Sequence, residues 1–216
     1  MNSPDFGFFD KEDELHISER QLPHWFQPGV ATFITFRTAD TDPMTIDTRT
    51  RRLTSLEITS ASQALGDLLL DAVADNASLA FMADVTREEA AEYWRGVARS
   101  NDGRALFVAE DGEGICGVVS VVPQEGSFQP HRAEISKLIV HRRARGHGLA
   151  TALMTRAEEA ARQMGRTLLT LFTRHGGDAE RLYLKLGWTR AGVIPNDSLK
   201  PDGTFCDAAI LYKQIG

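Results

Sequence analysis

The chain has 216 residues, of which 42% are hydrophobic, and it carries a formal net charge of −6. This length is sufficient to bury the core of one complete domain. The negative charge argues against a general nucleic-acid or anionic-membrane binder, because such binding depends on basic surface; a local basic site stays open.

Two further features of composition predict a cytoplasmic protein without a membrane partner. No apolar stretch reaches the length of a membrane-spanning helix, and the first residues are acidic and polar, unlike a signal peptide. Cys116 and Cys206 are too few for a disulfide framework and lack C-x-x-C metal spacing. We expect both thiols to pack as small apolar groups.

Residues 1–50 differ in composition from residues 51–216, so we expect an N-terminal appendage and one main domain. Residues 30–37 are rich in β-branched and aromatic side chains, which favours a strand. The segment 16–43 resembles the opening of the IS200-like, REP-associated tyrosine transposases. The His-x-His metal pair and the catalytic tyrosine of that family should follow, and neither does. We therefore predict no transposase chemistry, and interpret the segment as a remnant or as a flexible arm.

The main domain alternates strand and helix patterns. Apolar side chains recur at helical spacing in two segments before the first hairpin, and Thr86-Arg87-Glu88-Glu89 has the sequence of a capping box. Ser60 or Ser62 is expected to cap the earlier helix, and Asp178 the last one. In chain order, the predicted elements are a strand at 52–59, helices at 65–73 and 86–98, strands at 106–110, 115–122 and 132–140, a helix at 149–164, a strand at 167–172, a helix at 178–187, and strands at 189–194 and 205–212.

One strand-to-helix junction has the features of an anion-binding turn. It reads Arg143-Ala144-Arg145-Gly146-His147-Gly148-Leu149-Ala150. The start of a helix has unpaired N–H groups and partial positive charge, so an arginine-rich turn there suits a pyrophosphate. Gly146 and Gly148 permit a close approach of the backbone. The spacing is not that of a P-loop, and Thr151 stands where a dinucleotide fingerprint needs glycine or alanine. An ordinary glycine-containing turn is the alternative.

The pattern R-x-x-G-x-G-L-A at this junction resembles the acetyl-CoA signature of the GCN5-related N-acetyltransferases (GNAT), and the order of predicted elements is the order in that superfamily. The resemblance covers residues 51–216 and implies an α/β (α+β) GNAT fold, with a mixed central sheet of about seven strands and helices on both faces. It implies acetyl-CoA as co-substrate, with a cofactor-binding site formed by Leu138, Ile139, Val140, Arg143, Arg145, Gly146, His147, Gly148, Leu149 and Ala150.

Residues 68–73, 76–82 and 132–140 are similar to the tabtoxin-resistance-type acetyltransferases. This similarity implies transfer of the acetyl group to a primary amine of a small molecule, such as an antibiotic, a toxin or an amino-acid-like amine, by direct attack in a ternary complex. Relatives tend to carry Leu-Asp-Thr on the fifth strand, where this chain has Leu171-Phe172-Thr173. A carboxylate on the acceptor side is missing there, so we expect a different substrate.

The chemistry requires a base, because an alkyl ammonium with the pKa of lysine has only on the order of 10⁻³ of its molecules as free amine at pH 7. Glu134 lies where several superfamily members hold a glutamate that works through water. Glu110 and solvent are the alternatives. Tyr183 matches the tyrosine that commonly protonates the CoA thiolate in the superfamily. Each side chain also has a purely structural interpretation, Glu134 as a surface carboxylate and Tyr183 as a core aromatic.

The remaining expectations concern the acceptor site and the partners. Ser78, Phe81, Met82 and Trp94 are candidates to form the acceptor pocket, or they belong to the core. His147 and His175 have no neighbours at metal-ligand spacing, so no metal is expected. We predict a small-molecule amine as the partner, with no nucleic acid and no membrane, and a monomer or homodimer. The alternative functions are a non-catalytic acyl-CoA-binding protein and a DNA-associated protein acting through the N-terminal segment.

Overall fold

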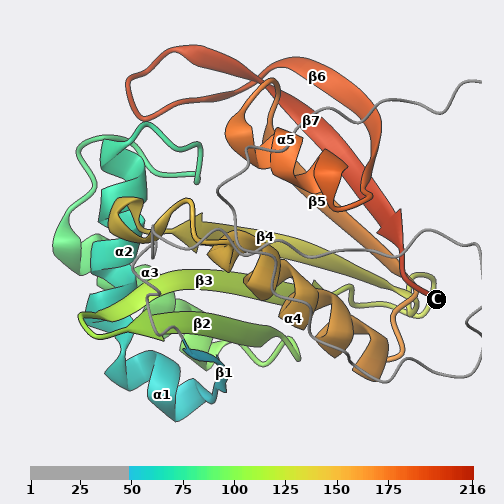
Figure 1. Ribbon diagram of the computed structural model, residues 1–216, viewed down its shortest axis with the longest axis horizontal. Helices are drawn as coiled ribbons and strands as arrows, with labels where there is room; N and C mark the ends of the chain where they lie inside the picture. Colours follow the sequence, from blue (N-terminus) through green and yellow to red (C-terminus); the bar gives the residue numbers. More distant parts are fainter. Residues whose placement is uncertain (1–48) are drawn as a thin grey trace, which may run out of the picture. The chain divides into compact units, whose positions relative to one another are not determined.

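A seven-stranded mixed sheet with helices on both faces forms the part of the chain that the computed structural model describes, residues 49–216 (Figure 1). Its elements are β1 (Arg49–Leu53), α1 (Ser55–Ser60), α2 (Ser62–Ala74), α3 (Arg87–Arg99), β2 (Ala105–Asp111), β3 (Gly114–Pro123), β4 (Arg132–Val140), the 3₁₀ turn η1 (Arg142–Ala144), α4 (Leu149–Gln163), β5 (Leu168–Arg174), α5 (Asp178–Lys185), β6 (Thr189–Leu199) and β7 (Phe205–Gln214). The transposase-like segment at 16–43 lies outside the described residues, so its interpretation and the proposed domain boundary stay predictions.

The strand order is β1-β2-β3-β4-β5-β7-β6. All neighbouring strands run antiparallel except β4 and β5, which are parallel and are connected through α4. A parallel pair needs a crossover connection, and α4 supplies it on one face of the sheet. The prediction of a mixed sheet with seven strands is confirmed.

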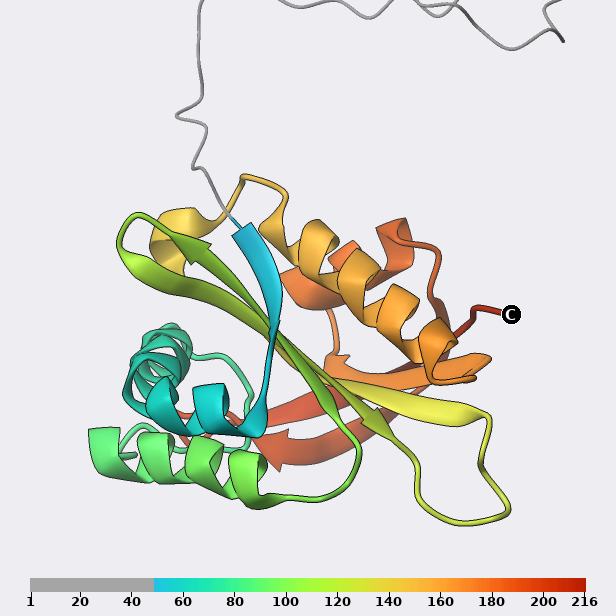
Figure 2. The same ribbon diagram turned by 90° about the horizontal axis from the view of Figure 1, so that it is seen from below.

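Each face of the sheet has its own core. Helices α1, α2 and α3 cover one face, and α4 and α5 cover the other, as Figure 2 shows for the two sides. Successive strand residues point to opposite faces, so Val108 and Val118 pack beneath α2 and α3, whereas Ala109 and Val119 pack beneath α4. Burying both faces in this way holds the middle strands in a fixed register.

The prediction of a strand at residues 52–59 is wrong. The strand β1 ends at Leu53, and α1 follows directly, because Thr54 and Glu57 form a capping box. The backbone N–H of Thr54 donates to Glu57 Oε2 at 2.8 Å, and the N–H of Glu57 donates to the Thr54 hydroxyl at 3.3 Å. The cap satisfies N–H groups at the start of a helix, so the chain turns into α1 after Leu53.

Other predicted details differ by a residue or are confirmed. Neither Ser60 nor Ser62 caps α2, since its N-cap is Ala61 without a side-chain hydrogen bond. The N-cap of α5 is Gly177, and Asp178 is its first helical residue. The capping box at Thr86 is confirmed. Both cysteines are buried and unpaired, as expected, and burial raises the pKa of Cys116 to about 11.

Candidate active site

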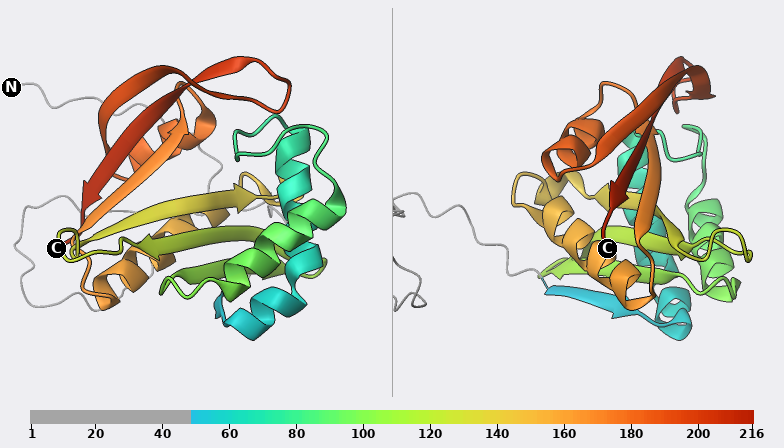
Figure 3. Two further views of the ribbon diagram at one scale, coloured as in Figure 1. Left: turned by 180° about the vertical axis from the view of Figure 1, so that it is seen from behind. Right: turned by 90° about the vertical axis from the view of Figure 1, so that its right-hand side faces the viewer.

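The parallel strands β4 and β5 pair over only three residues each. Arg132 pairs with Leu168, Ala133 with Leu169 and Glu134 with Thr170; both strands then continue without pairing to each other. Figures 1 and 3 show the two strands diverging from this point. The edge of β4 beyond Glu134 that faces β5 therefore has no strand partner within residues 49–216. Its backbone groups are available to an extended ligand.

A β-bulge in β4 accompanies this divergence. Val118 of β3 pairs with Ile139, whereas Ser120 pairs with Ser136, so one residue of β3 stands opposite two residues of β4, Lys137 and Leu138. Lys137 has a φ of +53°, in the left-handed region that a non-glycine residue rarely adopts. A bulge bends its strand and increases the local twist, so it directs β4 away from β5.

The glycine turn after β4 leads into the N-terminus of α4. Gly146 and Gly148 have φ values of +82° and +77°, and a Cβ atom at either position would meet nothing within 4 Å. Gly148 is the N-cap of α4, and no side chain caps the first turn of that helix. The N–H groups of this first turn are therefore free of side-chain partners and lie beside open space. Such an arrangement suits an anion.

The three arginines of the turn are already paired with carboxylates. Arg143 donates from Nη2 and Nε to Asp111 at 3.1 and 3.2 Å. Arg142 pairs with Asp71 of α2, and Arg145 with Asp75, the C-cap residue of that helix. These pairs fasten the turn to the β2–β3 hairpin and to α2. The backbone N–H groups and the helix dipole are therefore the main attraction for an anion at this turn. The guanidinium groups contribute less than the sequence suggested, because they are already paired.

Asp71 is one of two enclosed carboxylates in these pairs, with its side chain 9% exposed, against 7% for Asp111. It accepts hydrogen bonds from the backbone N–H of Arg142 at 3.0 Å and from Arg142 Nε at 2.8 Å. Burial alone would raise the pKa of Asp71, but the bonds from Arg142 and the nearby His141 outweigh it and hold that pKa below its usual value. Asp71 therefore stabilises the turn as a charged carboxylate.

The predicted cofactor residues of β4 pack their side chains into the core and leave their backbone groups for a ligand. Ile139 is buried beneath α2, and Leu138 and Val140 pack against the core on the opposite face. Leu149 is buried as well. The exposed residues of the turn are Arg145, Gly146, His147 and Gly148. The side chains of these strand residues thus fix the strand in place, and the main chain is left as the binding surface.

Glu134 is the last residue of β4 that pairs with β5, so it lies where the strands begin to separate. Its neighbours Ala133 and Ile135 are buried beneath α4, which places Glu134 on the opposite face, the one that α2 and α3 cover further along the strand. Among residues 49–216 its carboxylate makes no ion pair. Glu110 differs, because Arg51 binds both of its carboxylate oxygens at 2.9 Å. A carboxylate held in this way is a poor base, and Glu134 is the better candidate.

Tyr183 lies on α5 in the core beneath α4. Its side chain is 6% exposed, and its ring centroid is 5.9 Å from that of Trp188. Burial raises the pKa of Tyr183, so the phenol stays protonated over the physiological range. This packing agrees with the structural interpretation of Tyr183, and it leaves the hydroxyl available as a proton donor only if the ligand reaches it.

The predicted acceptor residues do not all lie at the surface. Ser78 and Phe81 are half-buried and Met82 is exposed, all in the loop between α2 and α3, whereas Trp94 is fully buried. Tyr93 links Trp94 to the loop, since its ring centroid lies 5.0 Å from that of Trp94 and 5.4 Å from that of Phe81. Trp94 therefore supports the loop from below.

The sequence analysis missed Lys137 as a site residue. Its ammonium Nζ donates to the carbonyl oxygen of Leu79 at 3.0 Å and lies 5.4 Å from the ring centroid of Tyr93. A lysine within the apolar run of a central strand was the available signal, since such strands seldom carry a charge without a reason. Its contact with the acceptor loop depends on the bulge, which the sequence does not reveal.

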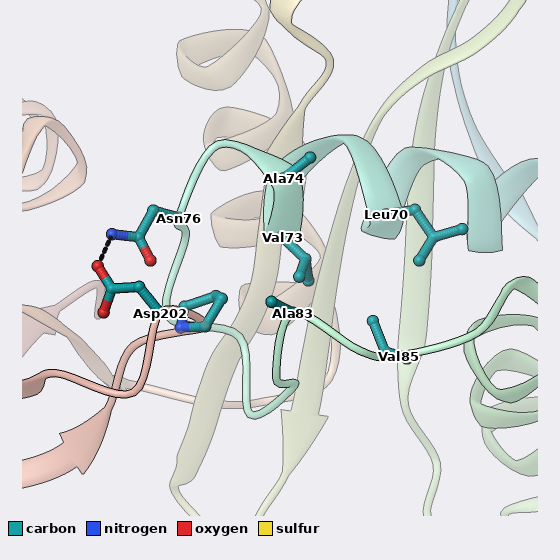
Figure 4. A pocket seen from close by; sticks show the side chains of 8 residues that line it. Leu70, Val73, Ala74, Asn76, Ala83, Val85 and Asp202 are labelled. Carbon is teal, nitrogen blue, oxygen red and sulfur yellow. Dashed lines mark hydrogen bonds between the residues drawn. The ribbon is translucent and has the colours of Figure 1, made fainter.

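A groove of about 530 Å³ lies on the outer side of α2 (Figure 4). Asn76 Nδ2 donates to Asp202 Oδ2 at 2.7 Å across one end of it, which joins the end of α2 to the β6–β7 turn. The residues that line it are Leu70, Val73, Ala74, Asn76, Ala83, Val85, Pro201 and Asp202. None of the predicted site residues is among them, although Asn76 and Ala83 belong to the loop between α2 and α3 that carries the predicted acceptor residues.

Two classes of site receive no support from the described residues. Within residues 49–216 no group of three or more His, Cys, Asp or Glu side chains is placed to hold a metal ion. In the same part of the chain no helix combines the length and the apolar character needed to cross a membrane.

Comparison with known proteins identifies the class. The family model of the acetyltransferase (GNAT) family matches residues 70–188. The phosphinothricin acetyltransferase of Sinorhizobium meliloti, solved with AcCoA, is 17% identical with a TM-score of 0.65, covering 80% of this chain and 90% of that one. The YncA protein of Salmonella typhimurium, solved with acetyl-CoA, is 21% identical with a TM-score of 0.64, covering 79% and 95%. The ribosomal-protein-alanine N-acetyltransferase of Brucella melitensis is 25% identical with a TM-score of 0.62, covering 77% and 99%.

The family match, together with the α/β fold, shows that the protein is an acetyltransferase. The chain belongs to the GNAT family. The prediction of the superfamily and of its fold is confirmed.

The ion pair of Asp71 generates a prediction for stability. Asp71→Asn should lower the free energy of unfolding at pH 7 by about 1 kcal/mol, because a neutral amide replaces a charge-assisted acceptor. The native pKa of Asp71 lies below its unfolded value, so its contribution is present above about pH 4 and is lost as the pH falls through the native pKa. Urea unfolding from pH 7 to pH 3 should show the difference shrinking on acidification. The exposed control Asp84→Asn should show little difference at either pH, and a pH-independent deficit in Asp71→Asn would contradict the charge argument.

Proposed function

We propose that the protein transfers the acetyl group of acetyl-CoA to a primary amine of a small molecule, by direct attack in a ternary complex. One observation carries the proposal: the unpaired edge of β4 is followed, after η1 and the glycine turn, by an open helix N-terminus without a side-chain cap. This juxtaposition provides, in one continuous path, backbone groups for an extended arm and a site for its charged end. Membership of the GNAT family supports the same reaction.

The glycine turn would bind the pyrophosphate of acetyl-CoA. The N–H groups of the first turn of α4 lack side-chain partners, and the space beside Gly146 and Gly148 would be filled by any Cβ atom. The residues present therefore fit an anion of this kind. Arg143 and Arg145 would orient the turn through Asp111 and Asp75 and add positive potential around the phosphates.

The edge of β4 would hold the pantetheine arm and the thioester. Leu138, Ile139 and Val140 would offer backbone N–H and C=O groups, and an N–H near the bulge would polarise the thioester carbonyl as a fixed donor. A donor that is already oriented needs no rearrangement when negative charge develops on the carbonyl oxygen.

Glu134 would accept a proton from the acceptor ammonium through water, and the free amine would attack the carbonyl carbon. The attacking nitrogen then loses its second proton to solvent as the C–S bond breaks, and Tyr183 would give its proton to the departing thiolate and recover one from solvent. The placement of Glu134 at the strand divergence, free of ion pairs among the described residues, supports this role. A non-catalytic acyl-CoA-binding protein is the alternative, and the burial of Tyr183 is the observation that favours it.

The direct test measures release of the CoA thiol from acetyl-CoA with a panel of primary amines and amino acids. Turnover with identification of the N-acetylated product supports the enzyme. Tight acetyl-CoA binding without turnover on any amine would favour the non-catalytic alternative. Absence of acetyl-CoA binding would refute both.

The glycine turn yields the first functional prediction. Gly148→Asp places a carboxylate and a Cβ in the open space at the helix start, so it should abolish acetyl-CoA binding measured by calorimetry. Gly165→Asp is the matched control, because Gly165 also has a positive φ, of +72°, and open space around it, but lies at the other end of α4. The control should unfold like Gly148→Asp and bind acetyl-CoA like the wild type. Equal affinities of both variants would place the phosphates elsewhere.

Glu134 yields a second prediction. Glu134→Gln removes the proton acceptor with little change of shape, so kcat/KM on a verified amine should fall by about 10²- to 10⁴-fold with unchanged acetyl-CoA affinity. Glu125 is an exposed carboxylate in the loop between β3 and β4, and the control variant Glu125→Gln should keep wild-type rates. Should Glu134→Gln be fully active, Glu110→Gln is the next variant, and activity in both would assign proton removal to solvent.

Removing the hydroxyl group of Tyr183 tests whether this residue is a proton donor or only a core aromatic. If its hydroxyl protonates the thiolate, Tyr183→Phe should lower kcat by about 10²-fold while acetyl-CoA binding stays the same. If Tyr183 only packs in the core, the same variant keeps both rate and stability. Stopped-flow measurement of thiol release on wild type and variant decides between them, with Tyr212→Phe, a partly exposed tyrosine of β7, as the control.

A further inference from the structure

Lys137 occupies a strained position at the point where the sheet divides. It is the non-glycine residue with a φ of +53° inside the bulge of β4, three positions beyond the last residue that pairs with β5. Strained backbone persists where the surrounding structure fixes it, and it concentrates at functional sites. The bulge brings the side chain of Lys137 to the face covered by α3, and thus to the loop between α2 and α3.

The ammonium group of Lys137 is enclosed without a counter-ion. It donates to Leu79 O at 3.0 Å and lies 6.0 Å from the ring centroid of Phe81 and 5.4 Å from that of Tyr93. Within residues 49–216 it forms no ion pair with a carboxylate. Aromatic faces attract a cation at these distances, but an enclosed charge normally also has an anionic partner. Burial lowers the pKa of Lys137, and the charge of Arg104 acts in the same direction, against that of Glu134.

The strand β5, which lies next to β4, carries no acidic side chain. Thr170 pairs with Glu134 and therefore lies on the same face, and Phe172 follows two residues later on that face with its side chain 53% exposed. On the other side of the acceptor loop, Arg174 Nη1 lies 3.4 Å from the carbonyl oxygen of Asn76, to which it donates. The strand β5 therefore brings no carboxylate to the face on which Lys137 places a cation.

We propose that Lys137 determines the charge selectivity of the acceptor site. It favours a primary amine whose far end carries a carboxylate and disfavours a primary amine that carries a second ammonium group. The inference rests on the proposed function, since it assigns the acceptor to the face of β4 that bears Glu134. The carboxylate of such an acceptor supplies the anionic partner that Lys137 lacks, while its amine lies toward Glu134.

Three amines of equal length test the proposal: 4-aminobutanoate, butylamine and 1,4-diaminobutane. For the wild type, kcat/KM should fall in that order, with about tenfold or more between the first and the last, because a nearby ammonium attracts a carboxylate and repels a second ammonium. Lys137→Met should reduce this ratio by about tenfold, whereas Lys137→Arg should retain it. Lys185→Met removes an exposed lysine of α5 and should leave the ratio unchanged.

The outcomes separate this proposal from the proposed function. Turnover of all three amines at equal efficiency, or an unchanged ratio in Lys137→Met, would overturn the role of Lys137 and leave the acetyltransferase activity standing. If none of the three is turned over, saturation-transfer NMR on the CoA-bound protein measures their binding instead. Preferential binding of 4-aminobutanoate that Lys137→Met abolishes supports the proposal, and equal or absent binding refutes it. Thermal unfolding of Lys137→Met checks that the fold is retained, and the Lys137→Arg variant shows whether charge alone restores selectivity.

Discussion

The separation of β4 from β5 is the constraint on which the rest of the structure depends. Two adjacent parallel strands would normally pair along their full length, because unpaired backbone groups are costly when enclosed. Here the pairing ends at Glu134, and the bulge at Lys137 bends β4 away from its neighbour. The strained bulge at Lys137 and the unpaired strand edge therefore belong together, because the bulge turns β4 away from β5. The separation leaves backbone groups of β4 unpaired in the middle of the sheet.

The helix α2 links the two halves of the site. Near its end it carries Asp71 and Asp75, which hold Arg142 and Arg145 of the glycine turn. Directly after it the chain enters the loop that contains Leu79, whose carbonyl binds Lys137. The turn that would bind the cofactor and the loop that would face the acceptor are thus fixed by one rigid element. A small shift of α2 would move both of them together, which gives the acidic residues of this helix a positioning role.

Much of this arrangement follows from local sequence rules, and the exceptions have physical reasons. The helix stripes, the hairpin and the glycine turn were predictable, because periodicity and turn chemistry act over a few residues. The short helix α1 was missed although Thr54 and Glu57 spell a capping box, since the β-branched residues around them favour a strand. The pairing of the arginines with Asp71, Asp75 and Asp111 depends on contacts between residues far apart in the chain, which a sequence alone does not display. The same holds for the bulge.

The paired arginines of the glycine turn imply that acetyl-CoA and the acceptor would be recognised in different ways. With its arginines paired, the turn recognises an anion mainly by backbone geometry, which is insensitive to small changes in surface charge. On the acceptor side the opposite holds, because Lys137 is enclosed without an ion-pair partner in the described part of the chain, and Glu134 is equally unpaired there. Binding of the donor would thereby depend on the backbone of the fold. Selection of the acceptor would depend instead on two side chains of opposite charge, three residues apart on one strand.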